Sequence, residues 1–256
     1  MTIGVSCTAF SAEDLGEWIG PISEEFDHWE IFSDGRHHLA DMGRRELKDL
    51  LSSYDLTYTI HTAIADVNIA SLNDRMRKAS LDTVLEDVAL APELGVDVLT
   101  VHPGIHSLAI RGLEERSVEL AAESMKVLDK AAEEYGVTIA IENMPSMPYF
   151  IGRTAEELEH IIEGTGLGVC FDVGHANTIG QIDEMVNRFG GRIVHMHVHD
   201  NMGDRDAHMT IGDGNIRFGE VLRRMSPYDG CYIIESKTFE SAVTSRVRLG
   251  SILGSL

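Results

Sequence analysis

Carboxylate and imidazole side chains recur along this chain at or just after short apolar runs. In chain order they are His61, His102, Glu142, Asp172, His175, His197, Asp206, His208 and Glu235. Hard carboxylates mixed with imidazoles suit a divalent cation such as Mn²⁺, Zn²⁺, Co²⁺ or Fe²⁺. Without a cation, buried carboxylates would need basic partners, and only Arg153 and Lys237 lie near these segments. We therefore expect a metalloenzyme.

The apolar runs have the length and the β-branched content of strands. We expect strands at residues 2–7, 28–33, 57–62, 97–102, 138–143, 167–172, 193–199 and 231–236. Helical periodicity is clearest at 74–94 and 114–135, and a glycine follows each segment where a helix C-terminal cap belongs. Further helices are expected at 41–53, 154–163, 180–189, 217–225 and 239–252. The chain therefore alternates strand and helix throughout.

This alternation, without a break in composition or a low-complexity linker, predicts an α/β fold. We expect residues 1–256 to form a single (β/α)₈ TIM-barrel domain. The alternative is a doubly wound open sheet, which would gather ligands from two or three strands near one switch point. Here six consecutive strand ends, from the third to the eighth, carry candidate ligands. That distribution favours the barrel, whose active site lies where the C-terminal ends of the strands meet.

Composition narrows the classes of partner. The chain of 256 residues carries 21 basic and 42 acidic side chains, a formal net charge of −21. Such a charge disfavours nucleic acid and anionic membrane surfaces as partners. No run is long and apolar enough to span a bilayer, and no signal peptide is evident, so we expect a cytoplasmic protein. The three cysteines are expected to be free, buried thiols. The sequence makes no prediction of oligomeric state.

Three alternate histidines mark the seventh predicted strand. His195, His197 and His199 all face the barrel interior, because side chains two residues apart lie on the same face of a strand. Along the strand, the first and third of these histidines lie too far apart to bind one ion together. We expect His195 to be a packed or hydrogen-bonded core residue. We place His199 at the rim, where it could support a ligand or contact a substrate.

The segment after this strand has two interpretations. Asp206 and His208 precede an Ile-Gly-Asp-Gly turn at residues 211–214, so the loop could serve backbone geometry alone. Alternatively, it supplies further metal ligands or a substrate-binding lid. His175 follows Asp172 by three residues and could share its site if the turn between them is helical.

Several segments together resemble the xylose isomerase-like TIM barrels, which include sugar-phosphate isomerases and epimerases and endonuclease IV. The resemblance covers essentially the whole chain and rests on HTAIADVNIAS, VHPGIHSL, IAIENMP, CFDVGHANTIG, HMHVHDN, DAHMTIGDGNI and IIES. In the isomerase and epimerase branch one divalent metal is held by Glu, Asp, His and Glu. The matching residues here are Glu142, Asp172, His197 and Glu235. The resemblance implies that Glu142 and Glu235 transfer a proton through an enediolate.

Endonuclease IV resembles the chain at more positions. Its three-zinc cluster uses nine ligands, and the chain matches their types at His61, His102, Glu142, Asp172, His175, His197, Asp206, His208 and Glu235. That resemblance implies cleavage of DNA at abasic sites. The strong acidity and the loop SDGRHHLADM, with Arg36 as its one Lys or Arg, count against a grip on duplex DNA.

We therefore expect a divalent-metal-dependent isomerase or epimerase of a sugar or sugar phosphate, with the endonuclease as the alternative. The expected cofactor is Zn²⁺, Mn²⁺ or Co²⁺, with one ion in an isomerase and up to three Zn²⁺ in an endonuclease. The expected partner is a small carbohydrate. The residues expected to contact it are His61, His102, His175, His199 and Lys237.

Overall fold

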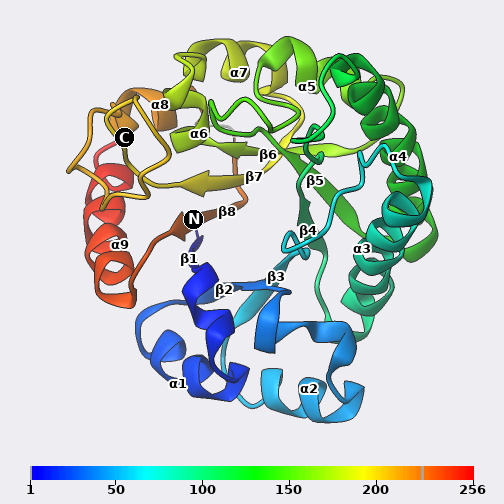
Figure 1. Cartoon of the computed structure of the whole chain (residues 1–256). Helices are drawn as coiled ribbons and strands as arrows, with labels where there is room; N and C mark the ends of the chain where they lie inside the picture. The colour runs from blue at the N-terminus through cyan, green and yellow to red at the C-terminus, as the bar shows by residue number, and fades with distance from the viewer. Residues whose placement is uncertain (1, 226–227) are drawn as a thin grey trace.

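A parallel barrel forms the centre of the molecule (Figure 1). The computed structural model describes residues 2–225 and 228–256. The strands are β1 (Thr2–Ser6), β2 (His28–Phe32), β3 (Thr57–His61), β4 (Val98–Val101), β5 (Thr138–Glu142), β6 (Gly168–Asp172), β7 (Ile193–Val198) and β8 (Cys231–Glu235). Each pairs in parallel with the next, and β8 pairs with β1 to close the ring. The predicted (β/α)₈ barrel is confirmed.

Helices surround the barrel, as Figure 1 shows. They are α1 (Leu15–Glu25), α2 (Arg44–Leu51), α3 (Asp74–Leu94), α4 (Glu114–Tyr135), α5 (Ala155–Ile161), α6 (Val173–Thr178), α7 (Ile182–Phe189), α8 (Phe218–Arg224) and α9 (Phe239–Leu253). Short 3₁₀ helices occur at Thr8–Ala12, Gly35–His37 and Leu39–Asp41. The two helices with the clearest periodicity, α3 and α4, have the predicted bounds.

Local signals account for the ends of α3. The Asn73 side chain accepts hydrogen bonds from the backbone N–H groups of Arg75 and Met76, which caps the N-terminus. Gly95 ends the helix in the left-handed conformation, at φ 73°. Helix α1 was not predicted, although Leu15, Ile19 and Ile22 give it a buried face at helical spacing.

Side chains along each strand point alternately to the hydrophobic core beneath the helices and to the barrel interior. In β2, Trp29 and Ile31 belong to the hydrophobic core, whereas Glu30 points into the barrel and contacts β7 histidines. Polar side chains therefore occupy the barrel interior near the C-terminal ends of the strands. Among the described residues, no helix is long and apolar enough to cross a membrane.

Candidate metal centre

Four candidate ligands from consecutive strands meet at the C-terminal end of the barrel. This central group contains Glu142 of β5, Asp172 of β6, His197 of β7 and Glu235 of β8, and their potential ligand atoms all lie within 4.8 Å of one another. His197 Nδ1 is 3.2 Å from Glu142 Oε1 and 3.3 Å from Glu235 Oε1. The barrel thus brings together the four residues expected to hold a single metal.

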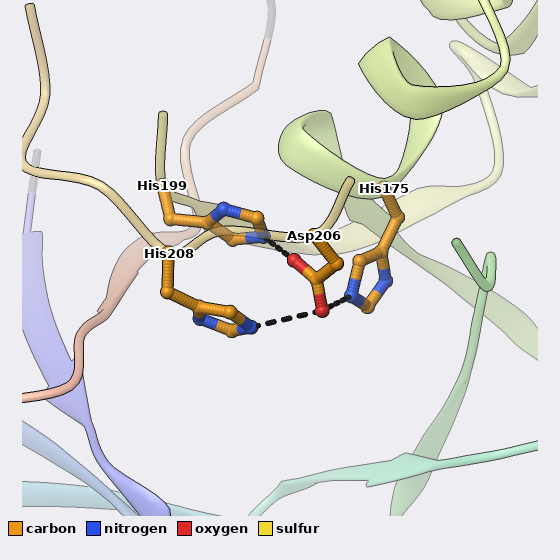
Figure 2. Close-up of side chains that lie close together, drawn as sticks. All are labelled: His175, His199, Asp206 and His208. Atoms are coloured by element: carbon orange, nitrogen blue, oxygen red, sulfur yellow. Dashed lines mark hydrogen bonds and ion pairs between the residues drawn. The ribbon is translucent and has the colours of Figure 1, made fainter. Parts of the chain in front are cut away.

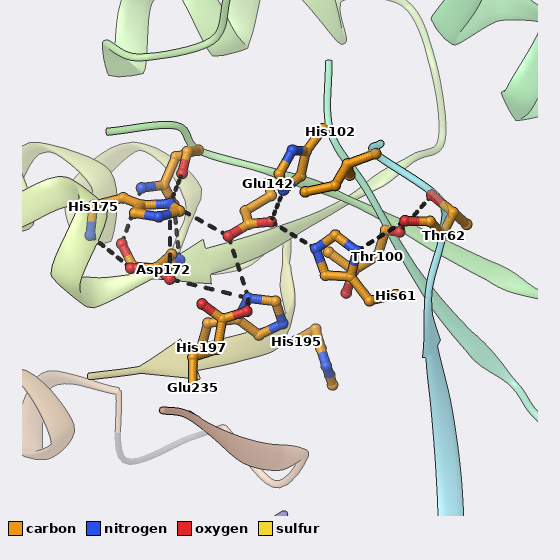
Figure 3. Close-up of polar contacts among 12 residues, drawn as sticks. His61, Thr62, Thr100, His102, Glu142, Asp172, His175, His195, His197 and Glu235 are labelled. Atoms are coloured by element: carbon orange, nitrogen blue, oxygen red, sulfur yellow. Dashed lines mark hydrogen bonds and ion pairs between the residues drawn. The ribbon is translucent and has the colours of Figure 1, made fainter. Parts of the chain in front are cut away.

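Glu142 also belongs to a second set, the side group, with His61 of β3 and His102 after β4 (Figure 3). His102 Nε2 is 2.9 Å from Glu142 Oε2, and His61 Nε2 is 3.4 Å from the same oxygen. One carboxylate oxygen of Glu142 therefore faces the side group while the other faces the central group. This placement suits a bridging ligand.

A third set, the outer group, gathers around Asp206 (Figure 2). Asp206 Oδ2 is 3.1 Å from His208 Nε2 and 3.4 Å from His175 Nε2, and Oδ1 is 3.4 Å from His199 Nε2. The rings of His199 and His208 stack with centroids 4.0 Å apart. His199 was expected at the rim, but it is fully buried, because the loop carrying Asp206 and His208 lies over it.

The start of α6 explains how Asp172 and His175 share a site. Asp172 caps this helix, since its Oδ1 accepts the backbone N–H of His175 at 2.6 Å. The turn between them is helical, as the sharing of a site required. Gly174 is needed here because a Cβ at this position would lie 2.1 Å from the His199 ring.

Asp200 organises the loop that carries the rest of the outer group. Its buried carboxylate accepts the backbone N–H groups of Gly212, Gly214 and Ile216 at 2.9 to 3.2 Å. A Cβ at Gly214 would lie 2.2 Å from Asp200 Oδ1, so this approach requires glycine. The turn serves backbone geometry, and that geometry directs Asp206 and His208 toward the other histidines.

Electrostatics couple the carboxylates to the imidazoles. Burial acts to raise the pKa of the Glu142 carboxyl, but the charges of His197 and His102 outweigh it and hold the pKa well below its usual range. Burial acts to lower the pKa of His175, yet Asp172 and Asp206 raise it well above normal. The buried carboxylates and imidazoles thus shift one another's pKa in opposite directions.

The donor set fits a divalent cation. Asp172 Oδ2, Asp206 Oδ1 and both ring nitrogens of His199 are buried and have no hydrogen-bond partner within the described part of the chain. Buried polar atoms are normally paired, so such unsatisfied atoms require an explanation. Carboxylate oxygens and imidazole nitrogens at these separations match the preferences of Zn²⁺, Mn²⁺ and Co²⁺.

Hollows at the two ends of the barrel differ in chemistry. At the mouth, Lys237, expected near the eighth strand end, lines a hollow of about 130 Å³ together with His208 and Glu235. A larger hollow of about 650 Å³ lies at the opposite end and is lined by His28 and His195. None of the candidate ligands lines the larger hollow, so the smaller one is the better candidate for substrate contact.

Three residues that support the site were not predicted. Glu30 contacts His197, and Asp200 orders the loop. The Asn143 side chain donates from Nδ2 to the Asp172 carbonyl oxygen and accepts the Asp172 N–H at Oδ1, both at 2.9 Å. The signal for Glu30 available in the sequence was a glutamate inside the apolar run of the second predicted strand. The roles of Asn143 and Asp200 depend on tertiary contacts. His195 matches its expected place, because it is buried and its Nε2 is 2.5 Å from Glu30 Oε2.

Comparisons with known proteins agree with this architecture. The chain is similar to an uncharacterized protein of Methanocaldococcus jannaschii, with 36% identity over 255 residues, covering 96% of this chain and 87% of the relative. The crystal structure of a D-tagatose 3-epimerase-like protein superposes with a TM-score of 0.93 at 34% identity, covering 100% of this chain and 98% of that one. A probable endonuclease 4 of Acholeplasma laidlawii is 26% identical over 187 residues, 66% of this chain and 63% of the relative.

The chain is thus similar both to an epimerase-like protein and to a probable endonuclease 4, and a family model matches most of its length. The model of the xylose isomerase-like TIM barrel family matches residues 23–248. This chain belongs to that family.

Proposed function

We propose that this protein is a divalent-metal-dependent isomerase or epimerase of a sugar or sugar phosphate. The observation that most supports this proposal is the placement of Glu142 and Glu235. These carboxylates come from β5 and β8 and approach the same nitrogen, His197 Nδ1, at 3.2 and 3.3 Å. Two carboxylates that approach one point from different strands can act on different faces of a substrate.

A divalent cation bound by Glu142, Asp172, His197 and Glu235 would polarise a substrate carbonyl and its neighbouring hydroxyl. One glutamate removes the proton from the carbon next to the carbonyl, and the electron pair forms the enediolate. In an epimerase the other glutamate, which enters the cycle protonated, gives its proton to the opposite face of the same carbon. In an isomerase the proton returns to the neighbouring carbon, while the hydroxyl proton passes to the former carbonyl oxygen. Glu142 is buried, whereas Glu235 is partly exposed, so a proton carried by Glu235 can exchange with solvent.

Of the remaining polar side chains, the partly exposed His102 and the exposed Lys237 are assigned to the substrate, while His61, His175 and His199 are buried and support Glu142 and Asp206. His61 and His102 border Glu142, while His175 and His199 border Asp206. Lys237 is exposed and lines the hollow beside Glu235, where it can reach a hydroxyl or an anionic group. A small carbohydrate with several hydroxyl groups is the ligand that such a polar lining favours.

A zinc phosphodiesterase that cleaves DNA at abasic sites is the second candidate. The side, central and outer groups favour it, because they form three adjoining donor sets and Glu142 is shared by two of them. Multi-metal sites activate water and clamp a phosphodiester. The formal charge of −21 opposes approach to DNA, and we therefore favour the sugar enzyme.

Deuterium exchange with metal analysis tests the proposal. Protein purified without chelator is analysed for metals and incubated with a panel of ketoses and their phosphates in D₂O. We expect about one metal ion per chain and deuterium at the carbon next to the carbonyl, since proton transfer admits solvent deuterium. Glu142→Gln and Glu235→Gln should lose the exchange. About three zinc ions, cleavage of abasic-site DNA and no exchange would overturn the proposal.

A further inference from the structure

Two histidines of the metal centre are held through Nδ1 by a backbone carbonyl oxygen. His61 Nδ1 is 2.9 Å from the Thr62 carbonyl oxygen, and His175 Nδ1 is 2.9 Å from the Asn143 carbonyl oxygen (Figure 3). A carbonyl oxygen only accepts hydrogen bonds, so in each ring Nδ1 is the donor. Nε2 of His61 faces Glu142 and Nε2 of His175 faces Asp206, while His175 Nδ1 also lies 3.3 Å from Glu142 Oε1.

His197 has the reverse orientation and a different anchor. Its Nδ1 makes a hydrogen bond of 3.2 Å with Glu142 Oε1, a place that a metal would take, and its Nε2 lies 2.8 Å from Glu30 Oε1. The ring N–H does not point squarely at this oxygen, so the contact is a close ion pair rather than an aligned hydrogen bond. A full negative charge thus takes the place that a neutral carbonyl takes beside the other two histidines.

Glu30 is itself held firmly. It crosses the barrel interior from β2, is fully buried, and its Oε2 contacts His195 Nε2 at 2.5 Å. The same oxygen accepts hydrogen bonds from the hydroxyl groups of Thr59 and Thr100 at 3.1 and 3.3 Å. These three contacts on one oxygen hold the carboxylate in a single orientation.

Glu30, His195 and His197 could also be taken for a metal site, because their potential ligand atoms lie close together. Two ligands bound tetrahedrally at about 2.0–2.1 Å from zinc lie roughly 3.3 Å apart. In this structure, however, His195 Nε2 lies 2.5 Å from Oε2 of Glu30 and His197 Nε2 lies 2.8 Å from Oε1. The hydroxyl donors on Oε2 further occupy the oxygen. Glu30 therefore acts on His197 and not on a cation of its own.

We propose that Glu30 is a positioning residue of the metal centre, fixing His197 as the Nε2–H tautomer so that Nδ1 is presented to the metal. Carboxylates in contact with the far nitrogen of a ligating histidine orient the ring and increase its basicity. The proposal rests on the proposed function only in that the central group binds a metal, and it requires no particular substrate.

Metal affinity of two matched variants tests this role. Glu30→Gln keeps the shape of the side chain and removes its charge, whereas Thr100→Val removes a donor to Glu30 that does not touch His197. Co²⁺ affinity is measured by competition with a chromophoric chelator, and thermal unfolding of the metal-free proteins reports the fold. We expect Co²⁺ binding about 10–100-fold weaker in Glu30→Gln and within about threefold of wild type in Thr100→Val.

The tautomer of His197 gives an independent readout if Glu30→Gln does not fold. In long-range ¹H–¹⁵N spectra of the zinc-loaded wild type, we expect a protonated Nε2 and a metal-bound Nδ1 for His197. A metal on Nε2, or a folded Glu30→Gln that binds Co²⁺ as tightly as wild type, overturns the positioning role. Failure of the wild type to bind Co²⁺ or Zn²⁺ instead overturns the metal centre on which the proposed function rests.

Discussion

The central group and the outer group lie side by side but are carried by different kinds of structure. Glu142, Asp172 and Glu235 are the last residues of strands, and His197 lies within one. Hydrogen bonds of the closed barrel therefore fix the backbone of every central residue. In the outer group, by contrast, Asp206 and His208 lie in an irregular loop, and His175 lies on the short helix α6.

This difference means that the outer group depends on its own local scaffold. Asp200 holds the loop backbone, and Gly174 makes room for the His199 ring. His208 also adopts a positive φ of 44°, which a non-glycine residue rarely does without such support. We infer that the outer group can be lost while the central group remains intact, and the following changes test that separation.

The largest effect is expected from Glu142→Gln. Glu142 faces both the central and the side groups, so the change removes a charge from two donor sets and a proton-transfer group. Turnover should fall by about 10³-fold or more, and metal content should fall with it. Deuterium exchange and elemental analysis measure the two effects. The control is Glu93→Gln, which alters an exposed glutamate on α3 that pairs with Arg44. Turnover near the wild-type rate in Glu142→Gln would refute the mechanism.

Asp200→Asn tests the loop scaffold directly. The amide keeps one acceptor oxygen but replaces the other with a donor that faces backbone N–H groups. We expect the free energy of unfolding to fall by about 3 kcal/mol, as for lost hydrogen bonds to a buried charge. Urea denaturation gives this value, and Co²⁺ titration shows whether the central site persists. Loss of all metal binding in the folded variant would show that the two groups are not separable.

Gly174→Ala tests the fit between α6 and His199. The added methyl group would lie 2.1 Å from the imidazole, so the ring or the helix must move. Overpacking of this kind costs about 1–3 kcal/mol in the free energy of unfolding. The control is Gly16→Ala on α1, where a Cβ meets nothing within 4 Å and helix propensity favours alanine. Equal stabilities of the two variants would contradict the steric role.

The same contrast explains how much could be predicted from the sequence. Apolar runs and glycine caps predict the strands and the long helices, and the barrel closure then implies that strand-end residues such as Glu142 and Glu235 converge. That argument does not extend to the outer group, because the place of His199 depends on how a loop lies over it. Glu30 was missed for a related reason: its partners on β7 lie across the barrel, at a sequence distance that no local pattern spans.

His208→Ala is expected to change the rate least, and it best distinguishes a single metal from a cluster of three. It removes a ring that contacts Asp206 and stacks on His199, while leaving every central residue in place. For the sugar enzyme we expect the central metal and kcat to be kept and KM to rise about tenfold, or about 1.4 kcal/mol of lost binding. A cluster of three metals would instead lose an ion and all activity. His160→Ala, at an exposed position on α5, controls for the loss of an imidazole. Metal loss with unchanged sugar turnover would contradict both assignments, because the outer ion would then serve neither catalysis nor substrate binding.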